Sequence, residues 1–338
     1  MRIGLLTTSF PRHPGDYAGS FVGDRAARLA AEGHQVDVLA AGSPGANPGI
    51  GAVTVTRLPA GADLFYGAGA PESLESDPAA WLAAAAFTAA LASTARLRAS
   101  GWDLVESHWL VPCALAASSA APGRPRRAWA HSGDVALLER LPLGRTLARR
   151  LATDGTELRF VSADLRARFA VLAGVTAGTV EPLPIPANLF APVPRPDPAA
   201  RARLGLSRPT VLAVGRLVPI KGHGRLLRAA ALAAGRGRPA DVVILGDGPE
   251  RERLRNLAGR LGVPLRLPGF VPRPEVAAWM RAADLFALPS ICLPNGRTEG
   301  APTTLREALA IGLPTVATPD PSELARAIQA LGPAPRDM

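Results

Sequence analysis

The sequence has few cysteines, few aromatic residues and no long apolar run. Its two cysteines, Cys113 and Cys292, lie far apart and form no CxxC pair, which excludes a disulfide scaffold and a cysteine-based zinc site. This usage fits a reducing cytoplasm, and residues 1–9 lack the long apolar stretch of a signal peptide. The longest nearly apolar segment, residues 79–92, is too short to cross a bilayer and predicts a buried helix. We therefore expect a cytoplasmic protein.

Lysine is also scarce, although the chain is basic. The 38 basic and 28 acidic residues give a formal net charge of +10, and Lys221 is the one basic residue that is not an arginine. Residues 1–190 are nearly neutral, whereas residues 191–338 carry 21 basic against 12 acidic residues. A basic domain suits phosphate, nucleic acid or an anionic membrane. The aromatic residues do not alternate with basic ones and no nucleic-acid-binding motif occurs, so we expect no nucleic acid partner.

A local group of arginines breaks the neutrality of the first half. Leucines lie between its members, a composition that suits a membrane-facing surface or the solvated face of a helix, and the solvated face is the simpler interpretation. The group comprises Arg124, Arg126, Arg127, Arg140, Arg145, Arg149 and Arg150. Peripheral contact with a membrane through Arg124–Arg150 is therefore one hypothesis.

Strand and helix signals alternate along the first half, which is the pattern of a parallel sheet. Predicted strands occupy residues 3–8, 36–40, 53–58, 104–108, 128–131, 160–161 and 180–183. Predicted helices occupy residues 79–98 and 163–172, and a further helix is expected to be capped by Ser20.

A proline-rich break separates this half from a second alternating series. Residues 182–198 contain seven prolines in 17 positions, too many for a central strand or a helix interior. Further strands are predicted at residues 210–214, 242–245, 265–267, 285–288 and 315–317. The predicted organisation is an N-terminal domain at 1–186, a Pro-rich hinge at 187–208 and a C-terminal domain at 209–338. We expect two facing, Rossmann-like α/β domains with parallel sheets and an active site in the cleft between them.

The first strand of the second series leads into a loop with two cations. Gly215 and Arg216 follow this strand, and Lys221 precedes a helix expected to begin near Gly222. Arginine binds phosphate oxygens in pairs, lysine acts as a compact charge, and a helix N-terminus favours an anion. The segment is not a P-loop, because its glycine spacing differs and no Ser or Thr follows the lysine. Two solvated charges on a loop are the alternative.

The loop after the next strand is Gly246-Asp-Gly-Pro-Glu250. It begins like a dinucleotide fingerprint, but Arg251 stands where the third glycine would be, and a proline opens the helix. A dehydrogenase is therefore not expected.

Two carboxylates, Glu299 and Glu307, stand eight residues apart, and the second lies in a helix expected from Thr303. Eight helical residues span about 12 Å, whereas a retaining glycoside hydrolase holds its two carboxylates ~5 Å apart. We therefore interpret the pair as two separate contacts to one extended ligand. The free amides around Ala301, Thr303 and Thr304 suit a phosphate. A solvated Glu299 and a Glu307 paired with an arginine are the alternative.

The first half has one candidate of its own. His131 lies at the carboxyl end of a predicted strand, where a histidine can contact bound substrate, and Asp134 is the candidate group that orients it. A structural histidine is the commoner case. The loop that ends at Gly19 and Ser20 follows the first strand and is an ordinary turn unless a ligand binds there.

Taken in order, these segments resemble the retaining GT-B glycosyltransferases of family 4. The resemblance is carried by VGRLVPIKGH, ILGDGPE, PGFVP and RTEGAPTTLREALAIGLPTVAT, between residues 211 and 318. It implies transfer of a sugar from a nucleotide-diphosphate donor, of UDP or GDP type, to a glycan or lipid-linked acceptor with retained anomeric configuration. No cofactor and no metal ion are implied, and the sequence contains no Asp-x-Asp pair.

The resemblance also implies residue roles. Arg216 and Lys221 would neutralise the departing diphosphate. Glu299 would hydrogen-bond the transferred sugar, and His131 would contact that sugar beside its reacting carbon. The residues implied to bind the rest of the donor are Glu307 at the ribose, Phe270 near the base, and Gly19, Ser20, Gly215, Ala301, Thr303 and Thr304 at the phosphates.

Two segments depart from the family pattern. Pro186-Ala-Asn-Leu-Phe190 stands where Pro-Asn-Gly-Val-Asp is usual, and Asp320 follows Pro319 where a glycine-rich loop, a strand and a helix are usual. We therefore expect a shortened C-terminal domain whose sheet lacks a strand. A donor-binding homologue with weak catalysis that needs a partner, and a GT-B sugar-nucleotide epimerase, remain alternatives.

Overall fold

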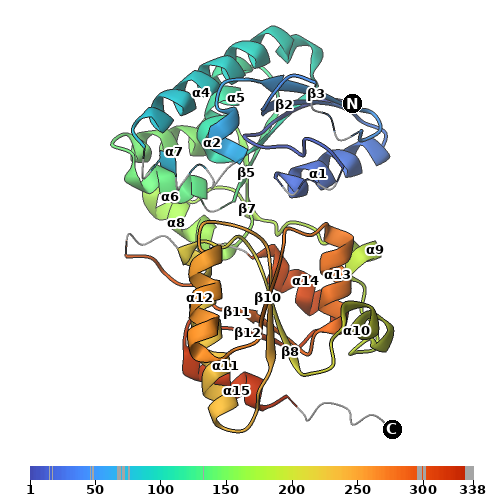
Figure 1. Cartoon of the computed structure of the whole chain (residues 1–338). Helices are drawn as coiled ribbons and strands as arrows, with labels where there is room; N and C mark the ends of the chain where they lie inside the picture. The colour runs from blue at the N-terminus through green and yellow to red at the C-terminus, as the bar shows by residue number, and fades with distance from the viewer. Residues whose placement is uncertain are drawn as a thin grey trace. The chain divides into compact units, whose positions relative to one another are not determined.

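The structure is a computed structural model that describes residues 1–14, 16, 18–45, 47, 49–66, 70, 73–74, 77–131, 133–294, 299 and 302–331. The chain divides into two compact units, Met1–Leu183 and Pro184–Met338, and each contains its own parallel sheet (Figure 1).

The first unit is built on short strands whose buried residues are mostly apolar, as expected for a parallel sheet covered on both faces. In the described part of this unit seven strands pair in the order β3-β2-β1-β4-β5-β6-β7, and Ile3 pairs with Val36 on one side and Leu104 on the other. The strands are β1 (Arg2–Leu6), β2 (Gln35–Ala41), β3 (Val53–Leu58), β4 (Leu104–His108), β5 (Arg126–Ala130), β6 (Glu157–Phe160) and β7 (Thr179–Val180).

Helices cover both faces of this sheet. Successive strand residues point to opposite faces, so Leu5 packs with α1 on one side and Leu6 packs with Phe87 and Leu91 of α4 on the other. The helical segments are α1 (Ser20–Ala31), α2 (Ala62–Tyr66), α4 (Ala79–Arg98), η1 (Ala99–Gly101), η2 (Leu110–Ala114), α5 (Leu115–Ala120), α6 (Gly133–Arg140), α7 (Gly144–Thr153) and α8 (Ala163–Ala173).

The second unit repeats this architecture with a smaller sheet. Its five described strands pair in the order β10-β9-β8-β11-β12. They are β8 (Thr210–Val214), β9 (Asp241–Leu245), β10 (Leu265–Gly269), β11 (Leu285–Leu288) and β12 (Thr315–Ala317). The helical segments are α9 (Ala187–Phe190), α10 (Pro198–Leu204), η3 (Pro219–Lys221), α11 (His223–Gly235), α12 (Arg251–Leu261), α13 (Arg273–Ala282), α14 (Thr303–Ile311) and α15 (Pro321–Gln329).

Two cores lie on the two faces of the second sheet. Ile244 packs under α11, α12 and α15, whereas Leu245 packs with Phe286 under α9, α10, α13 and α14. Figure 1 shows these two helical layers on either side of the strands.

Most predicted elements are confirmed by the structure. The strands predicted at 53–58, 104–108, 210–214, 285–288 and 315–317 and the helix predicted at 79–98 have the same bounds. The strand predicted at 180–183 is only Thr179–Val180, because the prolines that follow have no N–H to donate. Ser20 is not a cap either: α1 begins there, and its N-cap is Gly19, whose φ of 68° favours glycine.

The proline-rich segment expected to be a hinge packs onto the second unit. It contains α9 and α10, and Phe190 is buried in the core under α13 and α14. Asp197 caps α10 by accepting hydrogen bonds from the amides of Ala199 and Ala200 at 3.0 and 3.1 Å, and Pro198 opens the helix, a position that needs no N–H.

The arginine group of the first unit is divided between the interior and the surface. Arg126 is buried and donates to the carbonyls of Ala121 and Pro122 at 3.0 and 2.9 Å, and Arg127 pairs with Glu157 at 2.8 Å. These two arginines support the fold, so the prediction that they contribute to a membrane-facing surface is wrong. The exposed members are Arg140, Arg145, Arg149 and Arg150.

Among the described residues one helical stretch, Ala79–Gly101, is long and apolar enough to span a membrane by length and composition. Core helices of soluble proteins pass the same test. The same residues contain no group of three or more His, Cys, Asp or Glu side chains placed to hold a metal ion.

In each sheet the strand order reverses beside one strand. The reversal lies between β1 and β4 in the first sheet and between β8 and β11 in the second. Ligands of open α/β sheets bind at such points, outside the carboxyl ends of the strands. The loops after these four strands are therefore where each unit is expected to carry functional side chains.

Candidate functional site

In the second unit, the loop after β8 brings Lys221 back over Gly215. A Cβ on Gly215 would lie 3.1 Å from Cε of Lys221, so a side chain there would displace the lysine chain. Lys221 ends η3, and Gly222, at φ 64°, is the N-cap of α11. A Cβ on Gly222 would lie 2.0 Å from the carbonyl oxygen of Pro289, after β11. The loops that follow β8 and β11 are therefore in direct contact.

Lys221 and Glu299 form an ion pair between these loops. Nζ of Lys221 donates to Oε1 of Glu299, and Oγ of Ser290 donates to Oε2 of the same carboxylate. Both charged side chains are about five-sixths buried, with 16% and 17% of their surface exposed. Each carboxylate oxygen thus has a fixed donor. Glu299 is not solvated as the alternative held, and Ser290 is a contact that the sequence did not indicate.

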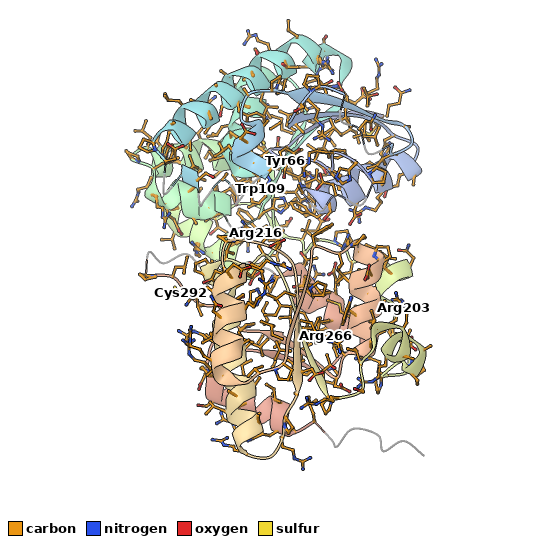
Figure 2. All side chains as sticks on the ribbon, in the orientation of Figure 1. Tyr66, Trp109, Arg203, Arg216, Arg266 and Cys292 are labelled. Atoms are coloured by element: carbon orange, nitrogen blue, oxygen red, sulfur yellow. The ribbon has the colours of Figure 1, made fainter. Side chains whose placement is uncertain are left out.

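Arg216 follows Gly215 directly after β8, at the end of the second unit where the strands present their carboxyl ends (Figure 2). The backbone of Arg216 is held from α11, because Nε2 of His223 donates to its carbonyl oxygen at 3.3 Å. His223 is 2% exposed; this burial, and then the charge of Lys221, lower its pKa to about 4. His223 is therefore neutral at physiological pH and adds no charge to the site.

The loop after β9 is locked against the loop after β8. Cβ atoms on Gly246 and Gly248 would lie 2.1 Å from the carbonyl oxygen of Gly215 and 2.6 Å from that of Leu217. The amide of Leu217 donates to the carbonyl of Asp247 at 2.9 Å. These glycines therefore serve close backbone packing, which explains the fingerprint-like sequence without a dinucleotide.

The N-terminus of α14 contains two of the predicted phosphate-binding residues. Thr303 and Thr304 are its first two residues after Pro302, and no side chain in the described part of the chain caps the helix. Oγ1 of Thr304 is buried and has no hydrogen-bond partner among the described residues. The predicted role of Ala301 falls on a residue outside those that the structure describes.

Glu307, one turn further along α14, is buried at 3% exposure and pairs with Arg273 at the start of α13. Cζ of Arg273 also lies 5.7 Å from the ring centre of Phe190. The paired-arginine alternative is thus present in the structure, and the predicted ribose contact stays a prediction.

Phe270 follows β10 and exposes 43% of its surface. Neighbouring strands lie about 4.8 Å apart, so the edge from β10 through β9 and β8 to β11 covers three such spacings, roughly 14 Å. Phe270 stands at one end of this edge and the Lys221–Glu299 pair at the other. An extended ligand is needed to contact both.

In the first unit, the loop after β1 ends at Gly19, where a Cβ would lie 2.2 Å from the carbonyl oxygen of Ser9. A buried arginine, Arg57, holds this loop by donating to the carbonyl of Phe10 at 2.9 Å and to Oη of Tyr66 at 2.8 Å. Gly19 and Ser20 therefore start α1 from a fixed loop. Tyr66 and Trp109 both lie at this end of the first unit (Figure 2).

His131 follows β5 and contacts the residue that ends β4. Its Nε2 lies 3.0 Å from Nδ1 of His108, and the two rings are within 13° of parallel. The rings of Phe21 and Trp109 each lie 4.8 Å from the ring of His131. Removal from water by these neighbours, and then His108, lowers the pKa of His131 well below its usual value.

Asp134 orients the backbone of His131 rather than its ring. Its carboxylate accepts hydrogen bonds from the amides of His131 at 3.1 Å, Leu110 at 2.8 Å and Val135 at 3.0 Å. Burial raises the pKa of Asp134 although these amides favour its ionised form. The imidazole of His131 is thus oriented by His108, and not by Asp134 as predicted.

A buried carboxylate stands behind His108. Glu106, fully buried in β4, accepts two hydrogen bonds from Arg25 of α1 at 2.7 and 2.8 Å, and its Oε1 lies 3.5 Å from Nε2 of His108. Burial opposes its ionisation, but the hydrogen bonds from Arg25 and the nearby His108 outweigh burial and hold its pKa well below the usual value. The sequence could have indicated this group, since Glu106 and His108 are two residues apart in β4 and therefore lie on the same face of the sheet.

Known proteins resemble the chain in sequence and in fold. Residues 198–330 match the family model of the glycosyl transferases group 1. The chain has 19% identity and a TM-score of 0.72 to the sucrose-phosphate synthase of Thermosynechococcus elongatus, covering 97% of this chain and 89% of that one. The chain has the GT-B fold. Anabaena HepE in complex with UDP and glucose is a second structural relative, with 20% identity, a TM-score of 0.67, and coverage of 97% and 89%.

Sequence relatives of this GT-B chain are glycosyltransferases. It is 36% identical over 251 residues to the GDP-mannose-dependent alpha-(1-6)-phosphatidylinositol monomannoside mannosyltransferase of Mycobacterium tuberculosis, a match that covers 70% of this chain and 57% of that protein. It is 38% identical over 110 residues to the putative colanic acid biosynthesis glycosyltransferase WcaL of Salmonella typhimurium, covering 32% and 27%. The chain therefore spans little more than half the length of the mycobacterial relative.

Proposed function

We propose that this protein is a retaining, metal-independent glycosyltransferase of family 4 that uses a nucleotide-diphosphate sugar. The observation that carries the proposal is the meeting of Lys221, Ser290 and Glu299 at the carboxyl ends of β8 and β11. This meeting lies in the segment that matches the group 1 glycosyltransferases. It joins a phosphate-binding cation to an acceptor for sugar hydroxyls at the point where ligands of such sheets bind.

Arg216 and Lys221 are proposed to neutralise the departing nucleotide diphosphate. Negative charge develops on the leaving phosphate as the glycosidic bond breaks, and fixed cations stabilise it without reorganisation. The N-terminus of α14, at Thr303 and Thr304, adds oriented amides for the same phosphates. These groups supply the positive charge that a divalent ion supplies in other transferases, which is why we propose a metal-independent reaction.

The remaining contacts are proposed to follow the donor along the same edge. Glu299 accepts hydrogen bonds from the transferred sugar, Glu307 binds the ribose and Phe270 lies near the base. His131 of the first unit contacts the transferred sugar. The acceptor hydroxyl attacks on the face from which the phosphate leaves and gives its proton to that phosphate, so the reaction needs no carboxylate nucleophile.

GDP-mannose is the proposed first donor, and a lipid-linked glycan the proposed acceptor. The support is the 36% identity to the mycobacterial mannosyltransferase over 251 residues. Peripheral contact at the cytoplasmic face of a membrane would then rest on Arg140, Arg145, Arg149 and Arg150, which are exposed. Flotation with anionic liposomes at low salt tests that contact, and absence of binding would refute it.

The test is a thermal-shift screen of UDP and GDP sugars followed by a transfer assay. Donors that stabilise the protein are incubated with glycan and lipid-linked acceptors in the presence of EDTA, and the anomeric configuration of the product is determined by NMR. We expect a product with the donor's configuration. Binding without turnover would favour a donor-binding homologue, and an isomerised free donor would favour an epimerase.

Lys221→Ala is expected to remove most of the thermal shift, because it deletes the cation at the proposed diphosphate. A matched control is Arg236→Ala, which removes an exposed cation after the far end of α11 and should leave the shift unchanged. Equal shifts for the wild type and Lys221→Ala would remove Lys221 from the donor site.

A further inference from the structure

His131, His108 and Glu106 form a chain of three titratable side chains that runs inward from the site of the first unit. Nε2 of His131 lies 3.0 Å from Nδ1 of His108, and Nε2 of His108 lies 3.5 Å from Oε1 of Glu106. The two imidazole centres are 5.2 Å apart, with planes 13° from parallel. The short nitrogen–nitrogen contact therefore lies in the ring planes, where the lone pair of the acceptor nitrogen points.

Two neutral imidazoles in such a contact share one proton, and the surrounding charges determine to which nitrogen it is bonded. Glu106 is ionised and accepts two hydrogen bonds from Arg25, so its second neighbour, Nε2 of His108, faces a carboxylate oxygen. A lone pair on that nitrogen would be repelled by the carboxylate. His108 therefore bears its proton on Nε2, and its Nδ1 is left as an acceptor.

A doubly protonated His108 is disfavoured by the local balance of charge. Glu106 is already paired with Arg25, and Arg127 lies 3.5 Å from its Oε2. His108 is fully buried between Trp129 and His131, and the only carboxylate that it faces among the described residues is Glu106. A third positive charge on one carboxylate would be buried without compensation.

We propose that Glu106 and His108 are positioning residues that fix His131 in the Nε2–H form, with Nδ1 as an acceptor for a ligand hydroxyl. His131 donates its Nε2 proton to His108. No hydrogen bond to Nδ1 of His131 is formed among the described residues, and the side chain is half-buried. The proposal that this hydroxyl belongs to the donor sugar rests on the proposed function. The proposal that His131 donates to His108 does not.

The direction can be measured by NMR on the whole protein labelled with ¹⁵N, without any donor. The imidazole signals of His131 are assigned by their loss in His131→Gln. We expect a slowly exchanging proton bonded to Nε2 of His131, with a coupling across the hydrogen bond to Nδ1 of His108. A proton bonded to Nδ1 of His108, or a doubly protonated His108, would overturn the proposal.

Two pairs of variants separate positioning from mere packing. His108→Asn places an amide oxygen near the position of Nδ1 and should retain the His131 proton, whereas His108→Leu fills space but accepts no hydrogen bond and should lose it. Glu106→Gln removes the negative charge that favours a proton on Nε2 of His108, and this should move the shared proton onto Nδ1 of His108. An unmoved proton in Glu106→Gln would refute the role of Glu106.

Donor kinetics then test the hydroxyl. His108→Leu is expected to lower kcat/KM by about tenfold, roughly the worth of one hydrogen bond, with much of the activity restored in His108→Asn. A donor analogue that lacks the contacted hydroxyl should abolish this difference. If NMR finds the proton on Nε2 of His131 but no donor binds, the proposed function fails, whereas the hydrogen bond from His131 to His108 stands. If donors react but the proton lies on Nδ1 of His108, the proposed function stands and the proposed positioning of His131 fails.

Discussion

Lys221 and Glu299 are each other's counter-ion in the second unit. A donor that places phosphate near Lys221 and a hydroxyl near Glu299 would give both groups new partners, so neither charge needs to be buried alone at any stage. The pair therefore holds both side chains in place before the ligand arrives. Ser290 fixes the carboxylate from its other oxygen, which makes Glu299 an oriented acceptor.

His223 makes stability dependent on pH at the residue scale. Its pKa of about 4 in the folded chain lies below the 6.5 of an unperturbed histidine, so the unfolded chain binds the proton more readily. Stability from this group is complete above pH 6.5 and falls as the pH decreases toward 4, by about 3 kcal/mol in total. The measurement is the free energy of unfolding by urea between pH 4 and 7.

The matched variant is His223→Gln, whose amide can still donate to the carbonyl of Arg216. It should show a flatter dependence of stability on pH than the wild type over this range. Because His131 also titrates abnormally, the comparison between the two proteins, and not the absolute slope, carries the test. Identical slopes would contradict a neutral, buried His223.

Sequence patterns predicted the individual residues of the site better than their contacts. The position of Lys221 in a loop between a strand and a helix N-terminus could be predicted, because spacing and local signals determine it. The contacts of Lys221 with Glu299 and of His108 with His131 join segments at the carboxyl ends of neighbouring strands. Strand order decides those contacts, and local patterns do not contain strand order.

At the scale of elements, arginines end several helices of the second unit. Arg195 donates to the carbonyls of Met280 and Ala283 at the end of α13, and Arg266 donates to those of Leu204 and Gly205 at the end of α10, at 3.0 and 2.9 Å. Helix C-termini have unsatisfied carbonyls and partial negative charge, which cations stabilise. Part of the positive excess of this half therefore supports the fold.

The two ends of α11 give a matched pair of glycine substitutions. Gly222→Ala would place a Cβ 2.0 Å from the carbonyl oxygen of Pro289 at a φ of 64°, so the loops after β8 and β11 would have to separate. We expect a loss of about 2–3 kcal/mol of stability, with loss of nucleotide binding. Thermal unfolding with and without donor is the measurement.

Gly235 is the control, because a Cβ there meets no atom within 4 Å and its φ is in the ordinary range. Gly235→Ala should be neutral or stabilising by roughly 0.5–1 kcal/mol and should bind donor normally. Equal behaviour of the two variants would show that the contact between the loops does not matter.

Elements were predictable where apolar runs lie between Gly and Pro signals, as for β8 and β11. The helices α6 and α7 were not assigned, because their segments were interpreted through their arginines. The hinge was wrongly extended over α9 and α10, since proline at the first turn of a helix has the same local signature as proline in a linker. Packing of Phe190 into a core formed by distant helices decides the difference.

At the scale of the whole molecule, each of the buried clusters formed by described residues belongs to one unit. Leu5 belongs to a core of the first unit and Phe286 to a core of the second. We therefore expect two calorimetric transitions, of which donor nucleotide raises only that of the second unit. A 100-fold excess over Kd contributes about 2.7 kcal/mol, roughly 5–10 °C for a domain of this size.

The transitions can be assigned with Leu5→Ala and Phe286→Ala, each of which should lower one of them, because truncation of a core side chain costs about 2–5 kcal/mol. A single transition that both variants lower equally would mean that the units unfold together. A donor-induced rise confined to the transition that Leu5→Ala lowers would place binding in the first unit.

The solitary lysine also makes the site chemically addressable. Reagents that acylate amines have two targets in this chain, the α-amino group of Met1 and Nζ of Lys221, and the second is mostly covered by Glu299 and the loop after β8. The mass of the modified protein thus counts acylation at the proposed donor site, with the N-terminus as an internal standard. The composition itself therefore provides the reporter for this measurement.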